Sequence, residues 1–89
     1  MKTPNFTNQF DKDMKLAKKQ KKDLTKIKAV MFDIICENPL PPKNKDHLLT
    51  GNYKGHRECH IEPDWLLIYL YKGNKVCFVR NGSHSELYK

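Results

Sequence analysis

The first half of the chain carries apolar residues at the spacing of amphipathic helices. Thr7 suits an N-cap, and the apolar residues after it recur at intervals of four and three: Phe10, Met14 and Ala17. This pattern predicts a helix over about residues 7–20 whose outer face is mostly lysine. A second stripe follows Asp23, another suitable N-cap, and consists of Leu24, Ile27, Met31 and Ile34. We expect each helix to bury one face against a sheet or against the other helix.

The second half has the pattern of a sheet. Residues 38–46 contain three prolines in four positions and are expected to form a connecting loop. Residues 57–61 alternate as a partly exposed strand that ends at Pro63, and the apolar run 65–71 predicts a central strand with both faces covered. A turn then leads into a strand at 76–80. This order predicts an α+β fold, with two N-terminal helices packed on an antiparallel sheet of three to four or more strands.

Length and charge narrow the function classes. The 89 residues suit a single domain, 1–89, because a chain this short buries too little apolar surface for a second core. Seventeen Lys and Arg against ten Asp and Glu give a formal charge of +7, which attracts nucleic acid, an anionic membrane or an acidic protein. The longest apolar run is far below the roughly 20 residues of a membrane span, and the N-terminus lacks the apolar stretch of a signal peptide. Three cysteines without a C-x-x-C pair favour a reducing compartment, so we expect a cytoplasmic protein with no membrane partner.

The last third of the chain is dense in groups that suit RNA cleavage. Cleavage without a metal needs a group that takes the proton of the 2′-hydroxyl, a group that protonates the leaving 5′-oxygen, and a cation for the phosphate. Histidine suits both proton transfers because its ordinary pKa of about 6.5 leaves both forms available near neutral pH. The acid–base side chains, the cations and the aromatic residues that could contact a base are His47, Arg57, Glu58, His60, Asp64, Trp65, Arg80, His84, Glu86 and Tyr88.

Several ordered motifs resemble the YafQ branch of the RelE toxin superfamily. They are Lys45-Asp46-His47, Tyr53-Lys54-Gly55, the stretch from Arg57 to Tyr69 with its Pro-Asp-Trp motif, the ending from Arg80 to Tyr88, and the segment from Asp11 to Ala17. The resemblance extends over nearly the whole chain. It implies a RelE-like microbial RNase fold and the toxin of a type II toxin–antitoxin pair, which enters the ribosomal A site and cleaves mRNA during translation. No cofactor is expected.

The resemblance also implies catalytic roles. His47, His60, Asp64 and His84 match the histidines and the aspartate of the family's motifs. We expect His60 and His84 to exchange protons with the RNA, with the choice of acid and base left open. Asp64 would orient a histidine or assist as a base, unless it only forms a turn with its own backbone. His47 would complete the proton relay or hold the RNA backbone.

Four further residues are expected to hold the RNA: Arg57, Trp65, Arg80 and Tyr88. Arg80 sits where these toxins commonly place a cation, and it would bind the scissile phosphate. Trp65 and Tyr88 would stack on a base, although the ring of Trp65 equally suits the core. Arg57 and Glu58 form either a surface ion pair or a pair in the cleft.

A toxin of this class needs a partner that keeps it inactive. The resemblance implies a cognate antitoxin of DinJ or RelB type, acidic where it contacts this chain. The complex would bind operator DNA through the antitoxin.

Two alternatives remain. His56, Cys59 and His60, with Cys36, His47 or His84, offer metal ligands, but the spacing matches zinc patterns poorly and adjacent strand residues point to opposite faces. The other is a non-catalytic basic RNA- or ribosome-binding module that uses the lysines of residues 12–28.

Overall fold

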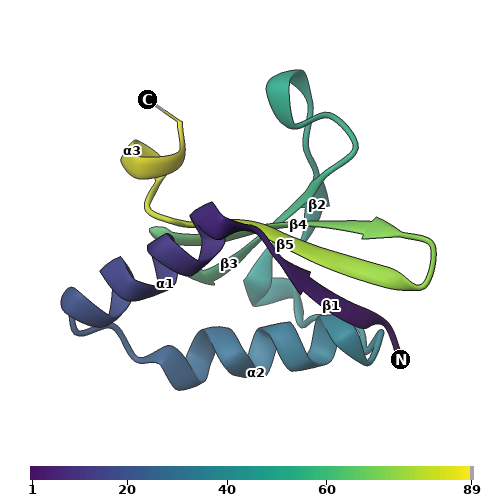
Figure 1. The fold of residues 1–89 in the computed structure, drawn as a ribbon, viewed down its shortest axis with the longest axis horizontal. Helices are drawn as coiled ribbons and strands as arrows, with labels where there is room; N and C mark the ends of the chain where they lie inside the picture. Colours follow the sequence, from purple (N-terminus) through teal and green to yellow (C-terminus); the bar gives the residue numbers. More distant parts are fainter. Residues whose placement is uncertain (89) are drawn as a thin grey trace.

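The computed structural model describes residues 1–88 as one mixed sheet with helices on both faces (Figure 1). The strand order is β1-β5-β4-β3-β2. The strands are β1 (Thr3–Phe6), β2 (His47–Leu48), β3 (Arg57–Glu62), β4 (Trp65–Lys72) and β5 (Lys75–Gly82). The helices are α1 (Asn8–Lys19), α2 (Leu24–Ile35) and α3 (His84–Leu87), with 3-10 turns η1 (Pro42–Asn44) and η2 (Gly51–Tyr53). The α+β class is confirmed. No helix within residues 1–88 is long and apolar enough to cross a membrane.

The two long helices begin where the sequence predicts. Thr7 caps α1 by accepting the N–H of Phe10 at 2.9 Å, and Asp23 caps α2 by accepting the N–H of Thr25 at 3.0 Å. Both helices lie against the same face of the sheet (Figure 1). Their apolar stripes are buried there in the main core, which includes Phe10, Ala17, Ile27, Met31 and Ile34.

Strand β4 is central and covered on both faces, as predicted. Alternate residues Trp65, Leu67 and Tyr69 belong to the main core under α1 and α2. Leu66 and Ile68 point the other way into a smaller core closed by Leu87, Leu49, Tyr53 and Val79. The sheet therefore has a helical face and an opposite face, where α3 and the η2 loop lie (Figure 1). We call this opposite face the α3 face.

The predicted antiparallel pairing holds from β2 to β5 but not for β1. β1 adds a fifth strand parallel to β5, with Phe6 beside Phe78. Its ring stacks on Phe78 with centroids 5.6 Å apart. Sequence reasoning missed β1 because four residues with a proline carry no alternation, and their partner lies about 70 positions later in the chain. The two-residue strand β2 and the four-residue helix α3 were missed as well.

Candidate functional site

Three histidines from three elements meet on the α3 face. Glu58 and His60 point to this face together because side chains two apart on a strand share a side. Strand β2 pairs His47 with Glu58, and α3 brings His84 over the sheet. The rings of His60 and His84 stand edge to face with centroids 5.9 Å apart. The structure therefore gathers the three histidines predicted to move protons.

Glu58 lies at the centre of this group. Its side chain is only 7% exposed, and its Oε1 lies 3.5 Å from Nε2 of His47 and 3.9 Å from Nε2 of His60. The hydroxyl of Tyr88 donates to its Oε2. Glu58 was not among the predicted catalytic residues, although its position two residues before His60 on a strand places it on the same face.

His47 has oxygen acceptors at both ring nitrogens. Its Nδ1 lies 2.7 Å from the carbonyl oxygen of Lys45, and its Nε2 faces Glu58. Both His47 and His60 thus face the same carboxylate oxygen, Oε1 of Glu58, and the relay role expected of His47 stays a prediction.

Asp64 orients His84. Its Oδ1 accepts the backbone N–H of His84 at 2.9 Å and lies 2.6 Å from the ring Nδ1. The hydrogen bond from the backbone N–H, then that from the ring, lowers the pKa of this carboxyl below its usual value of 3.8. This contact engages Nδ1 of His84 and leaves its Nε2 outside the pair. Asp64 thus reaches a partner 20 positions away instead of only closing its own turn.

A capping box fixes the helix that carries His84. The Ser83 hydroxyl accepts the N–H of Glu86 at 3.2 Å, and the Glu86 carboxylate accepts the N–H of Ser83 at 2.8 Å. Leu87 anchors the helix in the smaller core. The Ser-x-x-Glu pattern at 83–86 is the sequence signal for α3, a helix that was not among the predicted elements.

Arg80 is held by a buried carboxylate of α1. Its Nε donates to Oδ2 of Asp13 at 2.9 Å and its Nη2 to Oδ1 at 3.2 Å, while Asp13 is 6% exposed. The hydrogen bond to Asp13 raises the pKa of the guanidinium. Arg80 pairs with Ile68, whose side chain lies on the α3 face. Sequence analysis did not single out Asp13.

Tyr88 joins the acid–base group to an aromatic neighbour. Burial, then the hydrogen bond to Glu58, raises the pKa of its hydroxyl, which therefore stays a donor. Its ring stands edge to face on Tyr53 with centroids 6.1 Å apart. The residue is 44% exposed, so it retains open ring surface for a base.

Two residues predicted to hold RNA lie elsewhere. Trp65 is 1% exposed in the main core, where its Nε1 donates to Asn81 at 3.2 Å, so the ring has no open face for a base. Arg57 pairs with Asp46 at 3.2 Å and sits opposite Tyr69, which points to the helical face. Strand alternation therefore separates Arg57 from Glu58, and they form neither predicted pair.

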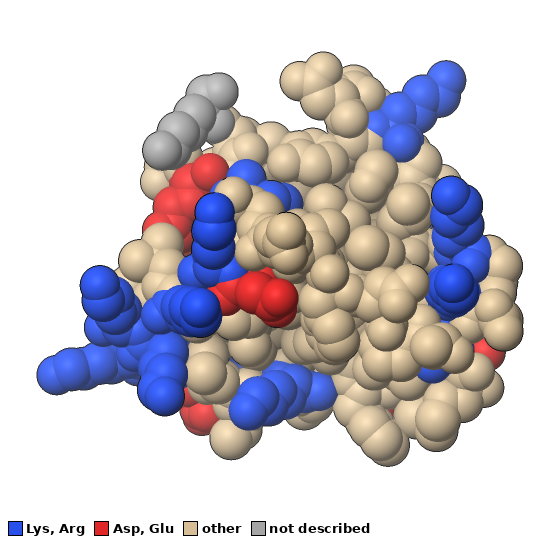
Figure 2. All heavy atoms as spheres, viewed as in Figure 1, with Lys and Arg blue, Asp and Glu red and all other residues tan. Residues whose placement is uncertain are grey.

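Lysines gather at the end of α1 near this site. Figure 2 shows them over the part of the surface where Figure 1 places α1 and the start of α2. The Nζ of Lys22 lies 5.3 Å from the ring centroid of Trp65, and its charge contributes to lowering the pKa values of Asp64 and Glu86. Positive charge thus reaches the edge of the histidine group.

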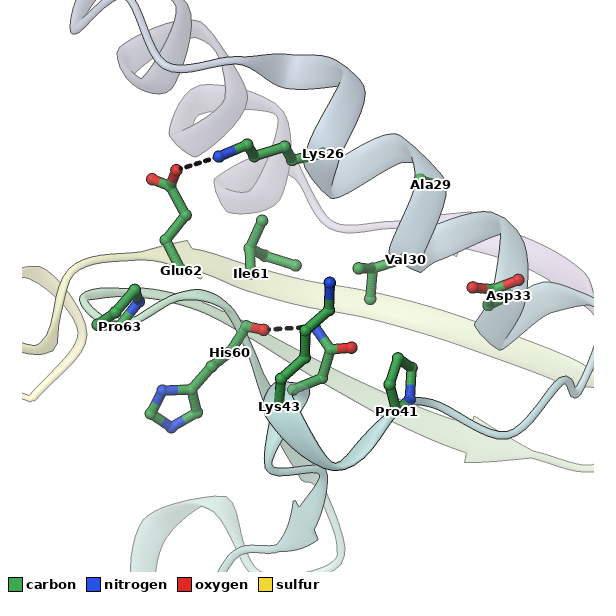
Figure 3. Close-up of a pocket in the computed structure, with 11 residues that line it drawn as sticks. Lys26, Ala29, Val30, Asp33, Pro41, Lys43, His60, Ile61, Glu62 and Pro63 are labelled. Atoms are coloured by element: carbon green, nitrogen blue, oxygen red, sulfur yellow. Dashed lines mark hydrogen bonds and ion pairs between the residues drawn. The ribbon is translucent and has the colours of Figure 1, made fainter.

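A hollow on the other side of β3 is a separate feature. It has a volume of about 470 Å³ and lies between α2, η1 and β3, and Figure 3 shows the ring of His60 pointing away from it. Of the charged side chains that line it, Lys26 lies 2.8 Å from Glu62. This hollow is separate from the histidine group, because the His60 ring lies outside it.

The alternative metal site is not assembled. Cys59 is buried in the main core, whereas His60 lies on the α3 face. Across residues 1–88, no three His, Cys, Asp or Glu side chains are grouped so as to hold a metal ion.

Known proteins are similar to this chain in sequence and in fold. The family model described as the bacterial toxin of type II toxin–antitoxin system, YafQ, matches residues 2–89. The mRNA interferase toxin YafQ of Escherichia coli K12 is 44% identical over 84 residues, which cover 93% of this chain and 91% of the relative.

Solved structures agree over the full length. YafQ from E. coli BL21(DE3) matches with a TM-score of 0.95 at 40% identity, and a chain of the E. coli DinJ–YafQ complex with 0.93 at 41%, each covering 100% of both chains. A metal-bound toxin from Helicobacter pylori matches with a TM-score of 0.93 at 46% identity, covering 99% of this chain and 100% of the other. These matches confirm the fold that the sequence resemblance implied.

Proposed function

The chain belongs to the YafQ family of bacterial type II toxins, and from this membership and the site geometry we propose that it is an mRNA endoribonuclease that inhibits translation. The observation that carries the proposal is the meeting of His47, His60 and His84 with two carboxylates on one face of the sheet. That group supplies both proton transfers of RNA cleavage.

The reaction proceeds by attack of a 2′-hydroxyl on the adjacent phosphorus. The new O2′–P bond forms as the P–O5′ bond breaks, which gives a 2′,3′-cyclic phosphate and a free 5′-hydroxyl. One of His60 and His84 takes the 2′ proton and the other protonates the 5′-oxygen. Asp64 holds His84 in place, and Glu58 with His47 forms the relay behind His60. Arg80 binds the scissile phosphate, and Tyr88 stacks on a base.

No metal is needed in this scheme, because each proton transfer has a side chain and the phosphate has a guanidinium. Pretreatment of the purified toxin with a chelator, removed before Mg²⁺-containing ribosomes are added, should therefore leave the cleavage rate unchanged. The H. pylori relative is a metal-bound toxin, so metal analysis of the purified protein belongs with this assay. Cleavage that is lost after this pretreatment and returns when one transition metal is added back to the toxin would contradict the metal-independent scheme.

The partner is a cognate antitoxin, as DinJ is in the E. coli DinJ–YafQ complex. The +7 charge of this chain favours an acidic contact region on that antitoxin. We propose that the toxin works in the cytoplasm at the ribosomal A site, and that the complex binds operator DNA through the antitoxin. Co-expression with the neighbouring small protein should give a co-purifying complex and restore growth.

Cleavage on purified ribosomes tests the catalytic assignment. Ribosomes that carry a short message in the A site are incubated with wild type, His60→Gln, His84→Gln and His56→Gln. His60→Gln and His84→Gln should each lose about 10²–10⁴-fold in rate relative to wild type. His56→Gln is the control for loss of a histidine outside the acid–base group, because the ring of His56 approaches the carbonyl of Lys54 at 3.4 Å and stands edge to face on Tyr53 with centroids 5.7 Å apart. Equal cleavage by all four proteins would contradict the histidine assignment, and absence of cleavage by all four, wild type included, would favour a non-catalytic basic module that depends on the lysines.

A further inference from the structure

A slot on the α3 face lies beside the histidines, and of its lining residues only Tyr88 has a role in the proposed reaction. We propose that it holds an unstacked nucleobase of the message next to the cut, with Tyr53 and Tyr88 as its aromatic walls and Asn52 as the side chain that reads the base edge. This inference rests on the proposed function. It identifies which part of the substrate is read, and by which residues.

The slot has the size and position of a ligand site. Its volume is about 470 Å³, and its lining residues are Thr50, Asn52, Tyr53, Leu87 and Tyr88. That volume lies within the range of about 300–1,000 Å³ typical of small-molecule sites. The η2 loop and α3 form it together on the face that also carries the histidines (Figure 1).

The walls of the slot suit a flat ring. Tyr53 and Tyr88 meet at an interplanar angle of 88° with centroids 6.1 Å apart, so they form a corner. A base can stack on one ring and contact the other edge to face. Stacked and edge-to-face contacts are the two favourable geometries between aromatic rings. Leu87 closes the slot with apolar surface.

Each wall is tied to a group of the proposed reaction. The hydroxyl of Tyr88 donates to Glu58 in the acid–base group. Tyr53 packs on the smaller core that contains Ile68, and Ile68 pairs with Arg80 across β4 and β5. A base in this corner therefore lies on the face of the sheet that carries both Glu58 and Arg80.

The lining favours a base over a phosphate. None of its five residues is charged, whereas a phosphate site needs cations or several N–H donors. Thr50 and Asn52 are exposed, and within residues 1–88 neither side chain has a hydrogen-bond partner. An asparagine amide offers one acceptor and two donors, the combination that distinguishes bases by their edges.

Cut-site sequencing tests this reading. Ribosomes translate a message with randomised codons, and the bases flanking every cut are counted for wild type, Asn52→Asp, Asn52→Ala and Asn5→Asp. Asn52→Asp should shift the preference at one flanking position towards bases that present an amino donor, because a carboxylate only accepts. Asn52→Ala should flatten the preference there. Asn5→Asp, an exposed change on β1, is the matched charge control and should leave the counts unchanged.

Stacking has its own variants. Tyr53→Leu should lower the cleavage rate by about 5- to 150-fold, the loss expected for one base stack, and Tyr53→Phe should recover most of it. If Asn52→Asp cuts nothing, the base preference of Asn52→Ala at the flanking position tests the role of Asn52.

Three results separate the possible failures. Unchanged base preference in Asn52→Ala, or full activity in Tyr53→Leu, would overturn the slot. Weaker antitoxin capture with unchanged preference would assign the slot to the antitoxin and also overturn it. Absence of cutting by the wild type would instead contradict the proposed function.

Discussion

The ion pair between Asp13 and Arg80 gives the sharpest test of the packing between α1 and the sheet. Asp13 accepts four hydrogen bonds, from Arg80 Nε at 2.9 Å and Nη2 at 3.2 Å, from the N–H of Asn81 at 3.1 Å, and from Gln9 at 3.2 Å. Asp13→Asn keeps the shape but removes the charge and one acceptor oxygen. Arg80 then loses its only ion-pair partner among residues 1–88.

The expected loss is large for a chain of this size. Removing one partner of a buried ion pair costs about 3–5 kcal/mol, and we expect about 3 kcal/mol because asparagine retains one acceptor and Arg80 keeps some contact with water. At about 0.05–0.15 kcal/mol per residue, a chain of this length has a free energy of unfolding of about 4–13 kcal/mol. The midpoint of thermal unfolding should therefore fall by more than about 12 °C.

Urea unfolding of wild type, Asp13→Asn, Arg80→Gln and the double variant measures the pair directly. The coupling energy should exceed about 1 kcal/mol, since the two side chains share their hydrogen bonds. Asp11→Asn is the matched control, because Asp11 lies exposed in the first turn of the same helix and its loss should cost less than about 1 kcal/mol. An unfolding free energy for Asp13→Asn within about 0.5 kcal/mol of wild type would refute the reasoning.

Three further predictions concern α3 and the thiols. Ser83→Ala removes the α3 cap at a local cost of about 1 kcal/mol. The cleavage rate should therefore fall while the midpoint of thermal unfolding changes little, and Ser83→Thr should restore the rate. A loss of rate that comes with a clear drop in that midpoint would argue against a local effect. A thiol reagent should label the other two cysteines but not Cys59 in the native protein, because its side chain is 0% exposed and burial raises its pKa to about 12; rapid labelling of all three would contradict this. The folded state lowers the pKa of Glu86, so its contribution to stability is present above its ordinary value of 4.5 and is lost as the pH falls through the lowered value. NMR of the backbone N–H of Ser83, its hydrogen-bond donor, should follow that loss, and Glu86→Gln should abolish this pH dependence.

The elements set by local patterns could be predicted from the sequence. The caps Thr7 and Asp23 and the helical stripes after them depend only on near neighbours, and the apolar run of β4 identified the strand covered on both faces. Strand β1 could not be predicted in this way, since its partner lies far along the chain.

The candidate site divides in the same way. Residue types and motif order pointed to His47, His60, Asp64 and His84, which the fold brings onto one face. The face of the sheet to which a strand side chain points depends on strand register. The register at Arg57 could not be predicted from the sequence. The burial of Asp13 could not be predicted either, because a single carboxylate on a lysine-rich helix gives no sign that it faces the sheet.

Mapping of new 5′ ends in cells tests the central claim most directly. The wild-type chain is induced in cells that carry a reporter message, and in cells that carry the same message without its start codon. The His84→Ala variant is induced with the intact message. A translation-dependent ribonuclease that uses this histidine predicts in-frame cuts in the translated message, with none in either control. Growth arrest without cuts would contradict the enzymatic account, and equal cutting of the untranslated message would contradict its dependence on the ribosome.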